Sequence, residues 1–474
     1  MSIFDKTCLN LMFYNMKKFL IISVILVVFT SCANYGGGEL TGVQDRMPWT
    51  SANPFGMVYV PIGSFHMGPN DQDVPWAVTA QSKVVSVSPF WMDETEITNN
   101  EYRQFVYWVR DSIAYRLLGE SIDEYLISED MYGEEIDPPL INWEQEINWH
   151  GEEENDILQE MYYPENERFY RRKNIDTRKL KFDYFWIDYK QAAQKIAIDK
   201  QSRRRYNYET GQYDGSVYNE KGELVPVKDR SSFIMHDHVY VYPDTLCWIS
   251  DFSYSYNEPM SNMYFWHPAY DNYPVVGVTW KQANAFCIWR TNLMNATAGQ
   301  NGEAFVQDYR LPTEAQWEYA ARGGLDLSMY PWGGYYTRND RGCFLANFKP
   351  LRGNYADDGG LHTVEVGIYE PNDYGLYDMA GNVAEWTLNA FDESAYSYTH
   401  DLNPDYSYNA LPGDPPVMKR KVVRGGSWKD IGYFLQNGTR TYEYQDTAKS
   451  YIGFRCVRAF MGRDYEFSGK SHVY

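Results

Sequence analysis

The sequence predicts an α+β domain that is irregular and rich in loops, and three observations lead to this prediction. Short β-branched runs are separated by turns of Gly, Pro and Trp, a pattern typical of short strands. Three segments begin with a Thr that is followed three residues later by Glu or Gln, the capping box that opens a helix. A long charged segment interrupts this pattern, so we expect one large domain that carries an insertion.

The N-terminus has the pattern of a targeting segment. Lys17 and Lys18 precede a twelve-residue apolar stretch at 19–30, which is too short for an ordinary transmembrane helix. Cys32 follows at the place where a bacterial lipobox holds its acylated cysteine. We therefore expect residues 1–31 to be a lipoprotein signal peptide and Cys32 to be lipidated. An ordinary secretory signal that is cut elsewhere is the alternative.

The composition restricts the possible partners. The chain carries a net charge of −21, and removal of residues 1–31, which hold three Lys and one Asp, leaves −23. Such an acidic balance argues against binding to nucleic acid or to anionic lipid surfaces. The 43 tyrosines suit a loop-rich core or a protein interface. Residues 32–55 are rich in Gly and polar residues and are predicted to be a tether.

The first helix is predicted from a capping box of Thr98 and Glu101. Apolar residues then recur at helical spacing as far as Leu117, and Gly119 ends the helix. Three short strands are predicted before it, at residues 57–61, 63–68 and 84–90.

The predicted insertion, residues 119–264, changes the sign of its charge along the chain. Residues 120–160 hold fifteen acidic side chains and no Lys or Arg, whereas residues 168–205 hold thirteen basic and four acidic ones. Either the two halves pair with each other, or the insertion is a docking surface for a protein partner. His236 and His238 share one face of a strand, but no third metal ligand is evident beside them.

The second half of the chain returns to a regular pattern. A buried strand is predicted at 273–280, and helices are predicted from Thr279 and from Thr313, each with its capping Gln. The first of these helices carries Cys287 on its inner face. Near the C-terminus, the Gly-Gly turn at 425–426 precedes a last short strand. The cysteines at 247, 287, 343 and 456 show no zinc spacing, and as an exported set they allow three complete disulfide pairings.

Eight motifs in order resemble the formylglycine-generating-enzyme (sulfatase-modifying factor) family. They cover residues 56–118 and 265–460, and the resemblance implies an irregular α+β fold related to C-type-lectin-like domains. The motifs are GSFHMG (63–68), EITN (96–99), the segment 274–289, RLPTEAQWEYAARGG (310–324), YPWG (330–333), GLYDMAGNVAEW (375–386), VRGGSW (423–428) and GFR (453–455).

The resemblance also implies where the chemistry of the family would lie. Members that use oxygen and copper carry two cysteines after the Gly-Gly-Ser motif, and thiolates are what Cu(I) requires. Asp430 and Leu435 stand at those positions here, so we expect no formylglycine synthesis and no catalytic residues. The histidine-bearing helical domain of the related iron-dependent sulfoxide synthases is not evident either.

Other features of the family are expected to persist. The resemblance implies two calcium sites, and side-chain oxygens of this kind are what Ca²⁺ prefers. In the alternative interpretation of the second site, its Asn caps a turn and its Glu pairs with an Arg. The resemblance further implies a Cys287–Cys456 disulfide, which leaves Cys247 and Cys343 unassigned. The predicted calcium ligands are Asn347 with Asp358 for the first site, and Asn382 with Glu385 for the second.

A lipoprotein signal, a domain without the two cysteines and a long insertion together resemble the GldK/PorK family of gliding-motility and type IX secretion lipoproteins. This resemblance implies an outer-membrane lipoprotein that forms a ring-like periplasmic complex with a GldN/PorN-type partner. Residues 33–38 lack the short acidic signal for export to the cell surface, which favours the periplasmic face. A metal-dependent protein-modifying oxidoreductase and a lectin-like cell-wall binder are the alternatives. Residues 461–474 are predicted to be a C-terminal tail.

Overall fold

The computed structural model describes most of the chain after the predicted tether. It covers residues 53–69, 81–130, 132–193, 206–207, 212–213, 215–251, 259–351, 353–354, 356 and 360–462. Asn53–Met461 forms one compact unit. The predicted signal peptide, Cys32 and nearly all of the tether and of the tail lie outside the described residues. In the part of the chain that is described, no helix has the length and apolar character needed to cross a membrane.

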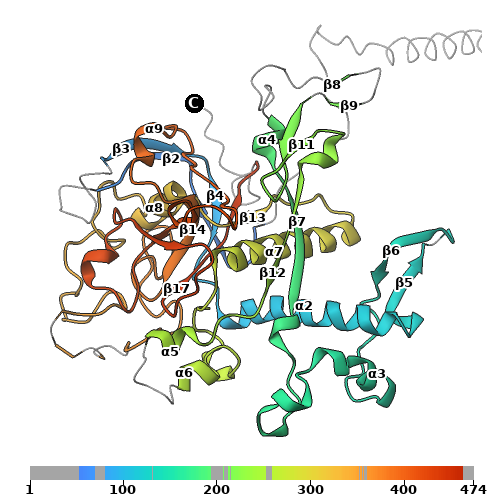
Figure 1. The fold of residues 1–474 in the computed structure, drawn as a ribbon. Helices are drawn as coiled ribbons and strands as arrows, with labels where there is room; N and C mark the ends of the chain where they lie inside the picture. The colour runs from blue at the N-terminus through green and yellow to red at the C-terminus, as the bar shows by residue number, and fades with distance from the viewer. Residues whose placement is uncertain are drawn as a thin grey trace, which may run out of the picture. The chain divides into compact units, whose positions relative to one another are not determined.

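The structure confirms the α+β class, with many short elements joined by long loops (Figure 1). The helices are α2 Asn99–Gly119, α3 Glu152–Ile157, α4 Tyr189–Ala193, α5 Cys247–Asp251, α6 Pro259–Met263, α7 Trp280–Asn301, α8 Glu314–Arg322 and α9 Ala395–Tyr398. The strands of the first half are β1 Met57–Val60, β2 Gly63–Met67, β3 Lys83–Val87, β4 Phe90–Asp93, β5 Leu126–Glu129, β6 Glu135–Ile141, β7 Lys181–Ile187, β8 Tyr206–Asn207, β9 Gln212–Tyr213, β10 Ser216–Tyr218, β11 Leu224–Pro226 and β12 Ile234–Tyr240. Those of the second half are β13 Tyr309–Arg310, β14 Ala384–Ala390, β15 Arg420–Arg424, β16 Thr441–Tyr444, β17 Ile452–Gly453 and β18 Val457–Ala459.

The domain contains two four-stranded sheets, and the first of them joins the beginning and the end of the domain. One has the order β1-β4-β18-β13, so that a strand near residue 90 pairs antiparallel with the last strand. The other has the order β16-β15-β14-β17 and contains one parallel pair, β14 with β17. The strands that pair in these sheets are mostly far apart in sequence. Long loops connect them along the chain.

All three predicted capping boxes are present. Thr98, Thr279 and Thr313 each accept a hydrogen bond from the backbone N–H three residues later, and the Glu or Gln at that position accepts one from the N–H of the Thr. Each box satisfies two backbone donors that the helix itself cannot pair, which explains why these helices begin where the sequence predicts.

The predicted strand at 273–280 is wrong. Its valines are buried, but in this segment only Pro274 forms a bridge, to Thr98, and Gly277 turns the chain with a φ of +74°. The Gly277 carbonyl accepts a hydrogen bond of 2.8 Å from the Asp244 N–H. The close approach of the end of the insertion therefore takes the place of a regular strand.

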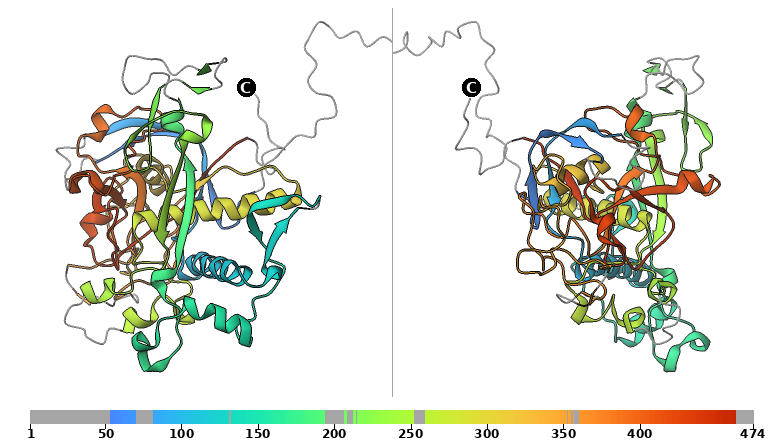
Figure 2. Two further views of the ribbon diagram at one scale, coloured as in Figure 1. Left: turned by 45° about the vertical axis from the view of Figure 1, so that its right-hand side comes forward. Right: turned by 90° about the vertical axis from the view of Figure 1, so that its left-hand side faces the viewer.

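The insertion packs on the core through aromatic side chains. The ribbon of β7 and β12 lies across α2 and α7 (Figures 1 and 2). Its inner face contributes Phe182 and Tyr184, and the Phe182 ring meets Phe105 of α2 edge to face at 5.2 Å. Because such rings bury large apolar areas, the insertion shares the main hydrophobic core with the domain.

A substitution of Gly277 tests the role of this close approach. A Cβ at this position would meet the Asp244 carbonyl oxygen and lie 3.2 Å from Cys247 Sγ. Gly277→Ala should lower the free energy of unfolding by about 2–4 kcal/mol, because it adds overpacking to a left-handed backbone. The control Gly302→Ala has a similar φ of +69° and open space around it, and it should cost about 1 kcal/mol. Denaturant unfolding measures both, and equal losses would contradict the packing argument.

Candidate functional site

A carboxylate stands at the position where the resemblance predicts the first cysteine of the family. Asp430 lies half-buried after the Gly425-Gly426 turn, and its Oδ2 accepts a hydrogen bond of 2.6 Å from Ser427 Oγ. Its backbone carbonyl accepts one of 2.8 Å from the Lys349 N–H. Burial raises the pKa of Asp430, and the hydrogen bonds from Ser427 oppose that rise only in part. The carboxylate therefore fixes a turn.

The residue at the position where the resemblance predicts the second cysteine is part of a small apolar core. Leu435 is fully buried and packs with Tyr330, Ala346, Phe348 and Ala380. An aliphatic side chain offers no electron pair to a metal or to oxygen. At these two positions, the arrangement can supply neither a thiolate pair nor a Cu(I) site.

The end of the insertion covers the Gly-Gly-Ser-Trp turn. Trp248 of α5 stacks on Trp428 with ring centroids 6.0 Å apart and an interplanar angle of 16°. His362 meets the Trp428 ring at 5.1 Å with an angle of 86°. Both tryptophans are buried, and Trp428 Nε1 donates to the Ser450 carbonyl at 3.2 Å. Aromatic packing therefore closes the region around Trp428.

A second buried group surrounds Arg455. Its guanidinium donates to both carboxylate oxygens of Glu385, the shortest contact being 2.6 Å, and Trp317 Nε1 donates to the same carboxylate at 2.8 Å. Glu385 therefore pairs with an Arg, as in the alternative interpretation of this residue. The positive charge of Arg455 therefore already balances the negative charge of the Glu385 carboxylate.

Two further carboxylates face this pair, and the sequence analysis did not single them out. Burial, with the charges of Asp378 and Glu385, holds the pKa of Glu96 well above its ordinary value. Burial also raises the pKa of Asp378 to about 6. Asp378 Oδ2 accepts a hydrogen bond of 2.6 Å from the Gly367 N–H, whereas Oδ1 is buried without a partner. Three carboxylates thus share one guanidinium.

The predicted calcium ligands are partly brought together. Asn347 Nδ2 lies 3.4 Å from Asn382 Oδ1, which also accepts a hydrogen bond of 3.0 Å from the Val364 N–H. Asn382 Nδ2 donates to Glu96 at 2.8 Å, and Asp358 lies outside the described residues. Both calcium sites stay predictions, because the side-chain groups of Asn382 and Glu385 already have protein partners.

The unpaired oxygen Asp378 Oδ1 lies close to the buried carboxylates of Glu96 and Glu385. This environment nevertheless fits a hard cation. Among the described residues, no three His, Cys, Asp or Glu side chains converge on one metal position. A calcium ion would therefore need amide and carbonyl oxygens in addition to Asp378. The signal for Asp378 in the sequence is weak, since its left-handed φ of +54° is evident only in the structure.

Helix α8 carries a separate ion-pair network that explains the RLPTEAQWEYAARGG motif. Glu318 pairs with Arg322 at 2.6 Å and with Arg424 of β15. Glu314 pairs with Arg440 at 2.6 Å. Burial opposes its ionisation, but Arg440 and Arg424 bring the pKa of Glu314 below its ordinary value. All five side chains are buried, so these charges fix the scaffold.

The predicted disulfide partners lie side by side. Cys287 Sγ and Cys456 Sγ are 3.5 Å apart in the core, and both are thiols in this structure. Their disulfide stays a prediction, although helix α7 and the end of the chain do place the two together. Cys247 is buried and Cys343 is exposed.

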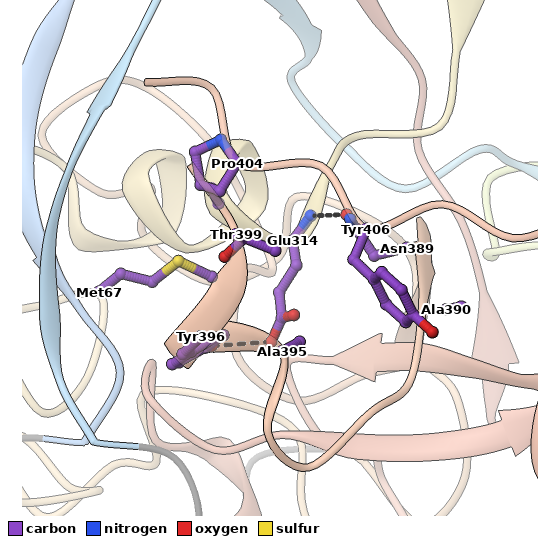
Figure 3. A pocket seen from close by; sticks show the side chains of 10 residues that line it. Met67, Glu314, Asn389, Ala390, Ala395, Tyr396, Thr399, Pro404 and Tyr406 are labelled. Atoms are coloured by element: carbon purple, nitrogen blue, oxygen red, sulfur yellow. Dashed lines mark hydrogen bonds between the residues drawn. The ribbon is translucent and has the colours of Figure 1, made fainter. Parts of the chain in front are cut away.

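One small hollow lies beside the first turn of α8. It is lined by Glu314, Asn389, Tyr396 and Tyr406 among others, and Tyr396 Oη donates to Glu314 at 2.9 Å (Figure 3). Only about 10 Å³ is open to the centre of a water molecule, which is room for one water. The hollow is therefore too small for a peptide or a glycan.

The raised pKa of Asp378 predicts a dependence of stability on pH. Because the folded chain holds this proton more tightly, stability should fall as pH rises from about 3.8 to about 6. Without calcium, Asp378→Asn should raise the free energy of unfolding at pH 7 by an amount of the order of 2–3 kcal/mol. Below pH 4 the variant and the natural chain should be alike. Urea unfolding in a chelator checks this, and an equal difference at both pH values would contradict it.

Comparisons with known proteins find the family that the motifs predicted. A family model described as "Sulfatase-modifying factor enzyme 1-like domain" matches residues 44–460. "Inactive C-alpha-formylglycine-generating enzyme 2" of Bos taurus is 35% identical over 191 residues, which are 39% of this chain and 50% of that protein. "Formylglycine-generating enzyme" of Streptomyces coelicolor is 34% identical over 190 residues, 39% of this chain and 52% of that protein. The chain thus spans about half the length of these curated relatives.

A solved structure, "Structure of PvdO from Pseudomonas aeruginosa", covers 85% of this chain and 94% of its own, with a TM-score of 0.39 and 17% identity. The curated relatives include both enzymes and proteins named inactive. The family model covers most of the chain, and its motifs account for the buried charges of α8 and β15. The chain therefore belongs to the sulfatase-modifying factor enzyme 1-like domain family.

Proposed function

We propose that this chain is a non-catalytic member of the family that serves as a structural component of a protein machine. The observation that supports the proposal is the local structure of the two residues that stand where the resemblance expects the reactive cysteines: Asp430 caps a turn and Leu435 fills an apolar core. The curated relatives include proteins named as inactive, so the fold exists without the activity. The conserved part of the chain then acts as a scaffold for the insertion.

The insertion supplies a surface for a partner. We define residues 120–160 as the acidic lobe. All of its carboxylates except Asp130 and Glu154 are exposed, and none of them forms an ion pair with a Lys or Arg that the structure describes. Lys173 and Lys179 of the basic half do reach the lobe, but they donate to an Asn side chain and to a backbone carbonyl. This arrangement favours docking over pairing between the two halves.

The acidic lobe is held firmly on the domain. Tyr125, Leu158 and Met161 pack against the buried residues of the last turns of α2 and form a small core of their own. On its hairpin of β5 and β6, Ile127 and Leu140 are opposed across the strands and exposed. A partner with basic side chains around an aliphatic patch would match this surface.

The machine that fits these features best is the type IX secretion and gliding-motility apparatus. In this proposal the chain is an outer-membrane lipoprotein of the GldK/PorK type, anchored through lipid on Cys32 and facing the periplasm. It docks a GldN/PorN-type partner and other components of the apparatus, and several copies form a ring-like complex. Calcium near Asp378 has a structural role in it, because it would offset the buried negative charge.

Reversal of charge on the hairpin tests the docking surface. Glu134, Glu135 and Asp137 are exposed, and their combined change to Lys should slow association with a purified GldN/PorN-type partner at least about tenfold at low salt. The matched control changes Glu303 and Glu393, exposed carboxylates outside the insertion, to Lys. Stopped-flow association rates decide the matter. Undiminished binding by the hairpin variant, or equal slowing by the control, would sink the docking proposal.

The metal content separates the structural proposal from an oxidoreductase. We expect the purified full chain to hold no stoichiometric copper or iron, because Asp430 and Leu435 cannot form the soft site of the family. Elemental analysis of protein purified from its own cells measures this. Stoichiometric copper or iron would favour the metal-dependent enzyme instead. Saturable retention on purified cell wall, without partner binding, would favour the lectin-like alternative.

A further inference from the structure

The outer face of the β7–β12 ribbon holds two histidines and a carboxylate with no role in the proposals above. The two strands pair antiparallel from Lys181 with Tyr240 to Ile187 with Ile234. Alternate residues point inward to the core, and the remaining ones are mostly exposed. This outer face belongs to the insertion, but it is distinct from the acidic lobe.

The strand register places three potential metal ligands next to one another. Asp183 lies directly opposite His238, and His236 stands two residues further along the same strand. Directly opposed residues have Cβ atoms about 4.5–5.5 Å apart, and diagonal neighbours about 7–8 Å apart, within reach of long side chains. All three side chains are exposed on the same face. The sequence showed only the two histidines, and the pairing of the strands supplies the third group.

We propose that Asp183, His236 and His238 bind a divalent transition-metal ion of the zinc class. Two imidazole nitrogens and one carboxylate oxygen are a ligand set that Zn²⁺ accepts, with a further position left for water or for a donor from a partner. Two histidines at alternate positions of a strand point to the same side, so both can face one ion. The site would be on the surface and open to solvent.

The three groups make other contacts in this structure and would have to turn toward the ion. His236 packs near Phe185 with ring centroids 6.2 Å apart, and His238 lies 6.5 Å from Tyr240. Asp183 pairs with Lys181 Nζ at 3.1 Å. Among the described residues, no three ligands already converge on one metal position. Each contact is exposed and therefore weak, so the ion can displace it by side-chain rotation.

The carboxylate of Asp237 does not belong to the site. Asp237 lies between the histidines in sequence but points to the opposite face, where it accepts from Lys281 at 3.4 Å. The backbone of the ribbon is fixed by seven opposed residue pairs and by its packed inner face, so metal binding needs no change of the strands. A ligand pair preset by a rigid sheet loses less entropy on binding than one on a loop.

Residue-specific labelling of histidines tests the site with the full chain. Diethylpyrocarbonate modifies exposed imidazoles, and mass spectrometry reads each position. With Zn²⁺ as the probe, labelling of His236 and His238 should fall, whereas labelling of His150, exposed in the acidic lobe, should not change. Asp183→Asn should raise the zinc concentration that gives half protection about tenfold.

A matched variant uses the same face. Lys181→Ala removes the ion pair that competes for Asp183, so protection should occur at the same zinc concentration as in the natural chain or at a lower one. All of these side chains are exposed, and an unchanged circular dichroism spectrum verifies folding. Equal labelling with and without zinc would overturn the proposal. Protection of Asp183→Asn at the concentration of the natural chain would overturn the role of the carboxylate.

Discussion

The buried ion pairs of helix α8 are the constraint on which the rest of the domain depends. Glu314 and Glu318 face Arg322, Arg424 and Arg440 in the interior, and each of these arginines also donates to a backbone carbonyl. Each charge is tolerated only while its partners remain, since an uncompensated buried charge costs about 3–5 kcal/mol. The helix, β15 and the loops between β15 and β16 are therefore fixed together, and with them the Gly-Gly-Ser-Trp turn.

This network holds the domain together without a contribution from Asp430 or Leu435. Asp430 accepts a hydrogen bond from Ser427 within the turn, and Leu435 extends an apolar cluster, so both residues fit the turn locally. The buried ion pairs and these two positions are therefore separate parts of the domain.

Local rules made part of this structure predictable from sequence. The capping boxes at Thr98, Thr279 and Thr313 act within one helical turn, and all three helices begin as predicted. The family motifs predicted the fold class, because each motif is likewise a local pattern of residues. The irregular path at Gly277 and the proximity of Asp378 to Glu96 arise from contacts between segments far apart in sequence. No periodicity reports such contacts, and so the strand prediction at 273–280 failed and the buried carboxylates were missed.

The end of the insertion is fixed on the Gly-Gly-Ser-Trp turn. Asp244 donates to Gly277, and four residues later Trp248 stacks on Trp428. This packing adds buried aromatic area that holds the insertion in one orientation. A surface that is held rigidly loses less conformational entropy when another protein docks on it, so the same contact that closes the turn also prepares the attached insertion for binding.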